Sequence, residues 1–350
     1  MTGAGEAFAL QCPAPLPPGG SVLIGHGSGG KLTAELIRTV FVPAFGGREL
    51  AKLGDAAVVE MGALCVAFTT DSFVVDPPEF PGSDIGALAV NGTVNDLAMM
   101  GATPLYMATA FILEEGFPMD TLRRIVASMA DAARTAGVEL VTGDTKVVER
   151  GSGDGVFITT SGIGLVPPGV LIGPDRARPG DVVLVSGPIG SHGVAVMSRR
   201  AGIGFDADVA SDTAPLTGLV QAMLAAGDVR CLRDATRGGV ASVLNELAEA
   251  SGVSITVRDE DLPVLEPVRA ACEMLGLDPV YVANEGVCVA IVAPGDAGSV
   301  LAAARSVPAG ARAEIVGVVE AGPARVRMET GLGVTRSLIM LAGGQLPRIC

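Results

Sequence analysis

Basic residues and aromatic rings are scarce in this chain of 350 residues. It contains 24 Lys and Arg against 38 Asp and Glu, a formal net charge of −14, and only 3% of its residues are aromatic. Proteins bind nucleic acids through basic patches and stacking aromatic side chains, so this composition argues against a nucleic-acid partner. A nucleotide is compatible with the acidity, because carboxylates can hold its phosphates through Mg²⁺.

Targeting signals and paired cysteines are also absent from the sequence. The first 20 residues have neither the basic start nor the apolar stretch of a secretory signal, and no uncharged apolar stretch is convincing as a membrane span. We therefore expect a cytoplasmic protein without a membrane partner. None of the six cysteines forms a Cys-x-x-Cys pair, and most are expected to be small buried hydrophobes. Cys350 is the exception, because no chain follows to bury it.

Glycine and proline are abundant instead, with 48 Gly and 23 Pro in a chain that is 49% apolar. Strand-like and helix-like segments follow one another without regular alternation, which predicts an α+β class with mixed sheets flanked by helices. The segment 167–180 carries four prolines and is the expected domain boundary. We expect a loose N-terminal arm at 1–20, an N-terminal domain at 21–167, a C-terminal α+β domain at 168–335 and a flexible C-terminal tail at 336–350.

A glycine-rich segment follows the first strand-like run, Val22–Ile24. Gly25–Lys31 fits the first seven positions of a phosphate-binding P-loop, but Leu32 stands where Ser or Thr should reach Mg²⁺. Two interpretations compete with a true P-loop: a strand-to-helix turn that needs glycine, or a flap whose N–H groups and Lys31 cover phosphates. We favour the flap.

Acidic side chains occur at the expected ends of several elements. Asp55 precedes a strand, Asp71 and Asp144 each end one, and Asp234 precedes a helix. Any one of them is more often a cap or a turn residue. Together they indicate one face of the fold, and hard oxygen ligands of this kind suit Mg²⁺ bound to substrate phosphates.

A helix that we expect to begin after the N-cap Ser83 carries three further polar side chains. Asn91 and Asn95 are four residues apart and share a helix face, and Asp96 lies beside them. Amides are costly to bury among apolar side chains unless they form hydrogen bonds. A last carboxylate, Glu285, directly precedes an apolar strand, where a Glu is usually solvated.

The end of the chain combines a hinge with a thiol. Gly343 and Gly344 provide the hinge, Pro347 favours an extended backbone, and Cys350 ends the chain. Seven residues of about 3.3 Å would let this thiol sweep roughly 23 Å. Prenylation needs a Cys four residues from the end, so that signal does not apply. A carrier role explains the layout: the enzyme acts on a group attached to its own last residue.

These residues resemble the HypE family of hydrogenase maturation proteins, the carbamoyl dehydratases. The family belongs to a superfamily with aminoimidazole ribonucleotide synthetase and selenophosphate synthetase. Marks shared at the superfamily level are the Asp55 segment, Thr69-Thr70-Asp71, the run from Val94 to Ala102, and Gly143-Asp144-Thr145. Narrower marks are the run from Asp144 to Val148, the run from Arg233 to Gly239, Asn284-Glu285-Gly286 and the ending Pro347-Arg348-Ile349-Cys350. The sequence departs at Gly54, where relatives often have a second acidic residue.

The resemblance implies a two-domain aminoimidazole ribonucleotide synthetase-like fold that binds ATP and Mg²⁺ and dimerises through its N-terminal domain. ATP would drive dehydration of an S-carbamoyl group on Cys350 to a thiocyanate, which supplies the cyanide ligand of [NiFe] hydrogenase iron. Implied metal ligands are Asp55, Asp71, Asp96 and Asp234. Implied nucleotide-binding residues are Lys31, Asn91, Asp144, Thr145 and Arg237. The implied catalytic residues are Cys350, Glu285 as the proton acceptor and Lys146 as a stabilising cation.

The implied partners are a second copy in a homodimer, a HypF-like carbamoyltransferase that loads Cys350, and an iron-bearing HypC–HypD-like scaffold. One rival is a selenophosphate synthetase-like enzyme that acts on a free small molecule, but Cys12 lies too far before Lys31 for a good match. The other rival is a non-enzymatic metal chaperone that uses Cys350 with His26 or His192. Two histidines, both interpreted here as loop residues, make a thin set of soft ligands.

Overall fold

The computed structural model describes residues 20–202, 209–343, 346 and 348–350. All but the last residue of the expected N-terminal arm, including Cys12, lies outside the described residues, as do Gly344 and Pro347 of the tail. Within the described part, no helix combines the length and the apolar character needed to cross a membrane.

The N-terminal half is built on a five-stranded sheet with the order β1-β2-β7-β5-β6. Its strands are β1 (Ala57–Met61), β2 (Leu64–Phe73), β7 (Val156–Val166), β5 (Thr103–Glu114) and β6 (Glu139–Val148). Neighbouring strands are antiparallel except β5 and β6, which are parallel and are joined by helix α4 (Met119–Ala136).

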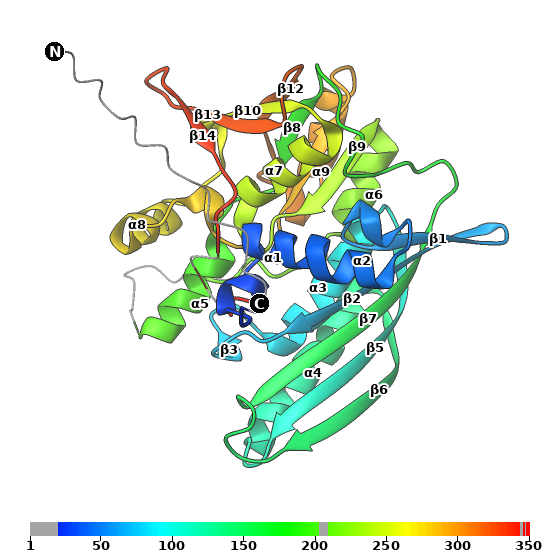
Figure 1. The fold of residues 1–350 in the computed structure, drawn as a ribbon, viewed down its shortest axis with the longest axis vertical. Coiled ribbons are helices and arrows are strands. Elements are labelled where there is room, and N and C mark those ends of the chain that lie inside the picture. Colours follow the sequence, from blue (N-terminus) through cyan, green and yellow to red (C-terminus); the bar gives the residue numbers. More distant parts are fainter. Residues whose placement is uncertain (1–19, 203–208, 344–345, 347) are drawn as a thin grey trace.

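Helices α3 (Ile85–Met99) and α4 (Met119–Ala136) cover one face of this sheet, called the inner face here (Figure 1). The two helices approach closely at Gly86, where a Cβ would lie 2.3 Å from the carbonyl oxygen of Ile125. The N-cap of α3 is Asp84, whose Oδ1 accepts hydrogen bonds from two N–H groups of the first turn. The prediction of Ser83 as the cap is therefore wrong; Ser83 pairs in a short hairpin of β3 (Glu79–Phe80) and β4 (Ser83–Asp84).

The opposite face of the sheet, the outer face, exposes large apolar side chains. Seven of them are between 37% and 64% exposed: Val59, Met61, Leu64, Phe68, Tyr106, Ile112 and Ile163. Three form one row across neighbouring strands, because Phe68 pairs with Ile163 and Ile163 pairs with Tyr106.

The C-terminal half contains a seven-stranded mixed sheet with the order β14-β13-β10-β12-β8-β11-β9. Its strands are β8 (Val182–Val185), β9 (Val229–Asp234), β10 (Ser254–Arg258), β11 (Cys288–Val292), β12 (Glu314–Glu320), β13 (Arg325–Glu329) and β14 (Thr335–Leu338). Alternate residues of β8 face two different cores: one contains α7 (Gly239–Ser251), the other α6 (Thr217–Ala226) and α9 (Ala297–Arg305). Its central strands are therefore covered on both faces.

Shorter elements complete the fold. Helices α5 (Ser191–Ala201) and α8 (Glu266–Leu275) pack against each other, and 3-10 turns occupy Leu50–Lys52, Asp259–Asp261, Pro279–Tyr281 and Pro308–Gly310. The N-terminal segment forms a 3-10 turn (Ile24–Gly27), α1 (Lys31–Leu36), a π-helical turn (Ile37–Phe41) and α2 (Val42–Phe45). The expected strand at 22–24 is wrong, so the glycine-rich segment lacks the preceding strand of a P-loop.

The last residues of the chain return to the N-terminal half. Strand β14 continues to Leu338, so the tail begins later than residue 336. Beyond it, the N–H groups of Lys31 and Leu32 donate to the carbonyl oxygens of Leu341 (2.9 Å) and Ala342 (3.1 Å). The final three residues then lie beside the end of β2, as Figure 1 shows for the C-terminus.

Candidate functional site

Three aspartates from distant parts of the chain meet between the two halves of the molecule. Asp55 precedes β1, Asp96 lies on α3, and Asp234 is the last residue of β9. One carboxylate oxygen of each lies within 4.8 Å of the others. The predicted set of metal ligands contains these three residues and Asp71.

The environment of this cluster disfavours negative charge. Burial, followed by the neighbouring carboxylates, raises the pKa of Asp96 and Asp234 well above the usual range. Burial also raises the pKa of Asp55, although Arg233, with Nε 3.3 Å from its Oδ1, opposes this. Crowded hard oxygen donors with too little counter-charge suit a divalent cation such as Mg²⁺, so the residues present fit the implied metal.

Neighbouring groups hold the aspartates in place. Thr69 Oγ1 lies 2.8 Å from Asp96 Oδ2 and 3.0 Å from the carbonyl oxygen of Asp55. Arg233 is fixed from two further sides, with Nε 2.8 Å from Glu246 Oε2 and Nη1 donating to the carbonyl oxygen of Leu53. Such contacts orient metal ligands and tune their basicity.

Asp71 lies near this cluster without joining its closest group. The sequence predicted that Asp71 ends its strand, but β2 continues to Phe73. Its charge nevertheless raises the pKa of both Asp96 and Asp234. Asn91, on the same helix as Asp96, is buried and its Oδ1 has no hydrogen-bond partner.

The terminal cysteine lies beside the same acidic site. The N–H of Val74 donates to the carbonyl oxygen of Cys350 (3.0 Å), and the N–H of Asp76 donates to that of Arg348 (3.3 Å). This is antiparallel, strand-like pairing. Burial raises the pKa of the Cys350 thiol to about 12; Arg237 opposes the shift, while Glu285, Asp71 and Asp234 add to it.

The side chains of His192 and Arg200 form hydrogen bonds with the backbone of the last residues. His192 Nε2 lies 2.7 Å from the carbonyl oxygen of Ile349, and Arg200 Nη2 donates to that of Arg348 (2.7 Å). The Ile349 side chain is 3% exposed, and Arg348 forms an ion pair with Asp154. The prediction that both histidines are loop residues is wrong for His192, which is fully buried on α5 and whose pKa is lowered to about 4 by burial.

Glu285 is a buried carboxyl group at the same place. Only 3% of it is exposed, and its Oε1 has no hydrogen-bond partner. Burial raises its pKa well above the usual range, aided by the charges of Asp234, Asp212 and Asp71 and opposed by Arg237. An ionised carboxylate in such surroundings is a stronger base than an ordinary glutamate.

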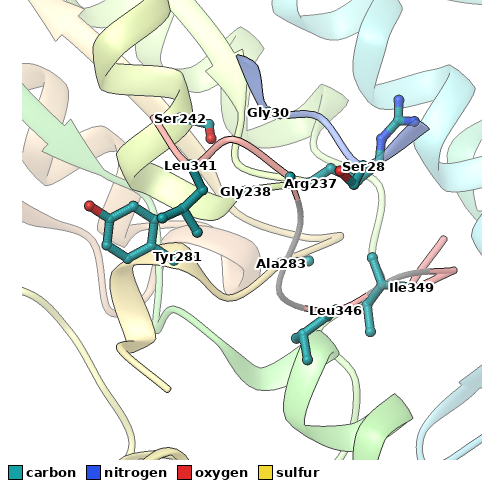
Figure 2. Close-up of a pocket in the computed structure, with 11 residues that line it drawn as sticks. Ser28, Gly30, Arg237, Gly238, Ser242, Tyr281, Ala283, Leu341, Leu346 and Ile349 are labelled. Atoms are coloured by element: carbon teal, nitrogen blue, oxygen red, sulfur yellow. The ribbon is translucent and has the colours of Figure 1, made fainter. Parts of the chain in front are cut away.

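Arg237 connects the glycine-rich segment with this site. Its Nη1 donates to the carbonyl oxygen of Gly27 (3.2 Å), and Gly29, at φ +77°, leaves no room for a Cβ against Arg237. Arg237 also lines a cavity of about 20 Å³ between the glycine-rich segment, the start of α7 and the tail, where Figure 2 shows it beside Ser28. Because the N–H groups of Lys31 and Leu32 bond to the tail here, they do not face a phosphate in this arrangement.

One chain alone does not bring Asp144, Thr145 and Lys146 to the carboxylates. Across the sheet, Asp71 pairs with Thr160, Thr160 with Thr109, and Thr109 with Gly143. Three strand spacings amount to about 14 Å. Asp144 follows Gly143 and so points to the outer face, where it forms an ion pair with Lys146 (2.5 Å). Asp144 is also inside strand β6, not at its end as expected.

Comparisons with known proteins give the family. The models "AIR synthase related protein, N-terminal domain" and "AIR synthase related protein, C-terminal domain" match residues 53–166 and 178–329. Carbamoyl dehydratase HypE of Azotobacter vinelandii is 56% identical over 333 residues, 95% of this chain and 98% of that protein.

The chain belongs to the HypE family of carbamoyl dehydratases. A crystal structure of a HypE–HypF complex matches with a TM-score of 0.84 and 48% identity, covering 87% of this chain and 99% of that one. A crystal structure of HypE in complex with ATP matches with a TM-score of 0.80 and 48% identity, covering 94% and 100%. The predicted two-domain α+β fold and the predicted family are thereby confirmed.

Sequence reasoning missed three residues of this HypE-family site. His192 and Arg200 hold the tail backbone, and Asp212 accepts a hydrogen bond from the N–H of Glu285 (2.9 Å). None of them belongs to a motif used for the assignment. For His192 the sequence did offer a signal: it is one of only two histidines, and it lies in an apolar helical segment that ends at Ala201.

Proposed function

We propose that this protein uses ATP to dehydrate a carbamoyl group carried on its Cys350 sulfur, leaving a thiocyanate. The nitrile then becomes the cyanide ligand of the iron in a [NiFe] hydrogenase. One observation carries the proposal: the terminal cysteine lies beside a buried, unpartnered Glu285 and close enough to the aspartates for their charges to raise its pKa. HypE is also the name of close relatives, and one solved relative is in complex with ATP.

The chemistry requires activation of a poor leaving group. A primary amide does not lose hydroxide, but phosphoryl transfer from ATP to the amide oxygen turns that oxygen into part of a phosphate. Removal of the N–H protons then completes the C≡N bond, and Glu285 is suitably placed to accept them. Asp55, Asp71, Asp96 and Asp234 would hold Mg²⁺, which neutralises negative charge on the triphosphate when bound.

The docked thiol is suited to carrying the group and unsuited to receiving it. With a pKa raised to about 12, Cys350 stays a neutral thiol at physiological pH, whereas the thiolate is the nucleophile. We therefore propose that the tail leaves this position to be loaded by a HypF-like carbamoyltransferase and returns for dehydration. An iron-bearing HypC–HypD-like scaffold would receive the product. We place the reaction in the cytoplasm, where ATP is abundant and thiols stay reduced.

The active unit that we propose is a homodimer formed through the outer faces of the N-terminal sheets. Large exposed apolar patches mark interaction surfaces, and this face carries the row of Phe68, Ile163 and Tyr106. A partner packed there could receive Asp144 and Lys146 from the first chain. This arrangement reconciles their outward position with their proposed roles near the nucleotide and the amide, alongside Lys31, Asn91, Thr145 and Arg237.

The test follows the fate of the terminal cysteine. The protein is loaded with a HypF-type carbamoyltransferase, purified, and incubated with or without Mg-ATP, and the mass of its C-terminal peptide is measured. We expect a carbamoyl adduct that loses the mass of one water only when ATP is present. Cys350→Ser should carry no adduct at this peptide, whereas Cys65→Ser, which removes another partly exposed thiol, should behave as wild type.

Two results would contradict the proposal. Product turnover that survives in Cys350→Ser would indicate a free substrate, as in the selenophosphate synthetase-like alternative. A carbamoyl adduct that persists in the presence of Mg-ATP would show that this enzyme does not dehydrate it. ATP cleavage by the unloaded protein alone decides neither case.

A further inference from the structure

A second buried carboxyl group, that of Asp212, contacts the backbone of Glu285. Asp212 belongs to an irregular segment that leads into α6, and its Oδ1 accepts the N–H of Glu285 at 2.9 Å. Its other oxygen, Oδ2, is buried without any hydrogen-bond partner, and the same holds for Glu285 Oε1. Glu285 and Asp212 therefore each have a buried carboxyl oxygen without a hydrogen bond. Such an oxygen destabilises the folded chain, and its presence in a native structure calls for a functional reason.

The surrounding structure keeps the two residues together. Asn95 on α3 donates from Nδ2 to the carbonyl oxygens of Ala214 (3.0 Å) and Glu285 (3.2 Å), and so connects both segments. Its Oδ1 accepts the N–H of Leu216 (2.8 Å). At Gly286 a Cβ would lie 1.9 Å from the carbonyl oxygen of Asp212, so only glycine permits this approach.

The environment of Asp212 suits a group that takes up a proton and releases it. Burial raises its pKa to about 7, while the N–H of Glu285 opposes the shift. Its charge is in turn one of the neighbouring charges that raise the pKa of Glu285. Because burial raises the pKa of both carboxyl groups, each can hold a proton near neutral pH, as proton-transfer groups in enzyme sites do.

The proposed reaction removes two protons from one nitrogen. The first leaves as the amide oxygen bonds to the γ-phosphorus of ATP and ADP departs. The second leaves as the carbon–oxygen bond breaks, phosphate departs and the C≡N bond forms. A single carboxylate that keeps the first proton cannot accept the second, so Glu285 must be discharged between the two steps.

We infer that Asp212 is the residue that discharges Glu285, which rests on the function proposed above. Glu285 takes the first proton from the carbamoyl nitrogen and passes it to Oδ2 of Asp212. Glu285 then takes the second proton and gives it to the departing phosphate. Asp212 releases its proton to water when the products leave, so one proton ends on phosphate and one in solvent. Asp212 acts through Glu285 and positions it, without contacting the substrate.

The experiment compares the two chemical steps in a single turnover of Cys350-carbamoylated protein with Mg-ATP. Asp212→Asn keeps an oxygen that accepts the N–H of Glu285 but cannot take up a proton, whereas Asp212→Ala removes both properties. For Asp212→Asn we expect ADP to form within about threefold of the wild-type rate. Water loss at Cys350 should be slowed by about 100-fold or more, the usual contribution of a proton-transfer group, and a phosphorylated adduct should accumulate.

Circular dichroism and thermal melting show whether Asp212→Asn folds like the wild type, and Asp228→Asn, on an exposed loop, serves as the matched control. The inference is overturned if Asp212→Asn forms thiocyanate as fast as wild type while Asp212→Ala does not, because the role is then only structural. Equal slowing of ADP and thiocyanate formation overturns it as well. If wild-type protein itself loses no water, the proposed function fails first; a normal wild type with an unimpaired Asp212→Asn variant defeats this inference alone.

Discussion

Carboxylates on the two sides of the five-stranded sheet differ in burial, in pairing and in the direction of their pKa shifts. On the inner side, Asp55, Asp96 and Asp234 are crowded, half-buried or buried, and short of positive partners, which raises their pKa values. On the outer side, Asp144 is exposed and paired with Lys146, and that hydrogen bond lowers its pKa. The inner group is incomplete without a cation, whereas the outer pair is already neutral.

This difference indicates what each face lacks. The inner carboxylates need positive charge, which Mg²⁺ can supply. The outer face needs no charge, but its exposed apolar row lacks a covering surface. By contrast, strand β11 of the C-terminal sheet, which lies next to the edge strand β9, is buried along its whole length within the chain itself. We therefore propose that metal binds on the inner side and that the chain dimerises through the outer face, and the following changes test that division.

The largest effect should come from the inner cluster. Asp96→Asn removes one charge and one oxygen ligand at the centre of the group, so ATP cleavage by carbamoylated protein should fall by about 100-fold or more. ADP release measures it. Asp131→Asn, on the exposed side of α4, is the matched control and should leave the rate unchanged. Undiminished ATP cleavage in Asp96→Asn would show that the catalytic metal does not bind at this cluster.

The next effect concerns the apolar row of the outer face. Ile163→Glu places a carboxylate at its centre, and a twofold interface would bring two such charges together, weakening dimerisation by about 100-fold. Analytical ultracentrifugation measures the change. Val318→Glu in the C-terminal sheet is a close match, since Val318 is 38% exposed and Ile163 is 37% exposed, and it should leave the dimer intact. Equal dimerisation of both variants would contradict the assignment.

The fold and the inner cluster could be predicted from the sequence, whereas the outer pair could not be placed. Asp55, Asp96 and Asp234 lie in short motifs of the family, and carboxylates in these motifs predict metal ligands. Asp144 lies in such a motif too, but the face it occupies depends on strand register, and a shift of one residue would reverse it. Asp212 lies in an irregular segment without periodicity, so its contact with Glu285 is visible only in three dimensions.

A mixing experiment tests whether the outer pair serves the partner chain. Asp96→Asn and Lys146→Ala chains should each be inactive alone. If Lys146 acts across the interface, a mixed dimer contains one site with both residues intact. Random exchange of equal amounts should then restore about a quarter of the wild-type activity. If mass spectrometry verifies the exchange and no activity returns, Lys146 does not act across the interface. The proposed dimer would then no longer explain why Lys146 points to the outer face.

The smallest effect is a difference in the pH dependence of stability. In the folded chain, Asp96 has a raised pKa, so its ionisation destabilises the folded state progressively as pH rises above the unfolded value of about 4. Asp144 has a lowered pKa, so its contribution is present above that value and is lost on acidification. Without metal, Asp96→Asn should therefore gain stability over wild type between pH 4 and pH 8, by a few degrees in melting temperature. Asp144→Asn should lose stability slightly over the same range.

Added Mg²⁺ provides the control. Near pH 8 it should stabilise the wild type and so reduce the difference in melting temperature between wild type and Asp96→Asn, while the difference between wild type and Asp144→Asn stays unchanged. If the stability of both variants relative to wild type changed with pH in the same direction, the two faces would not differ electrostatically.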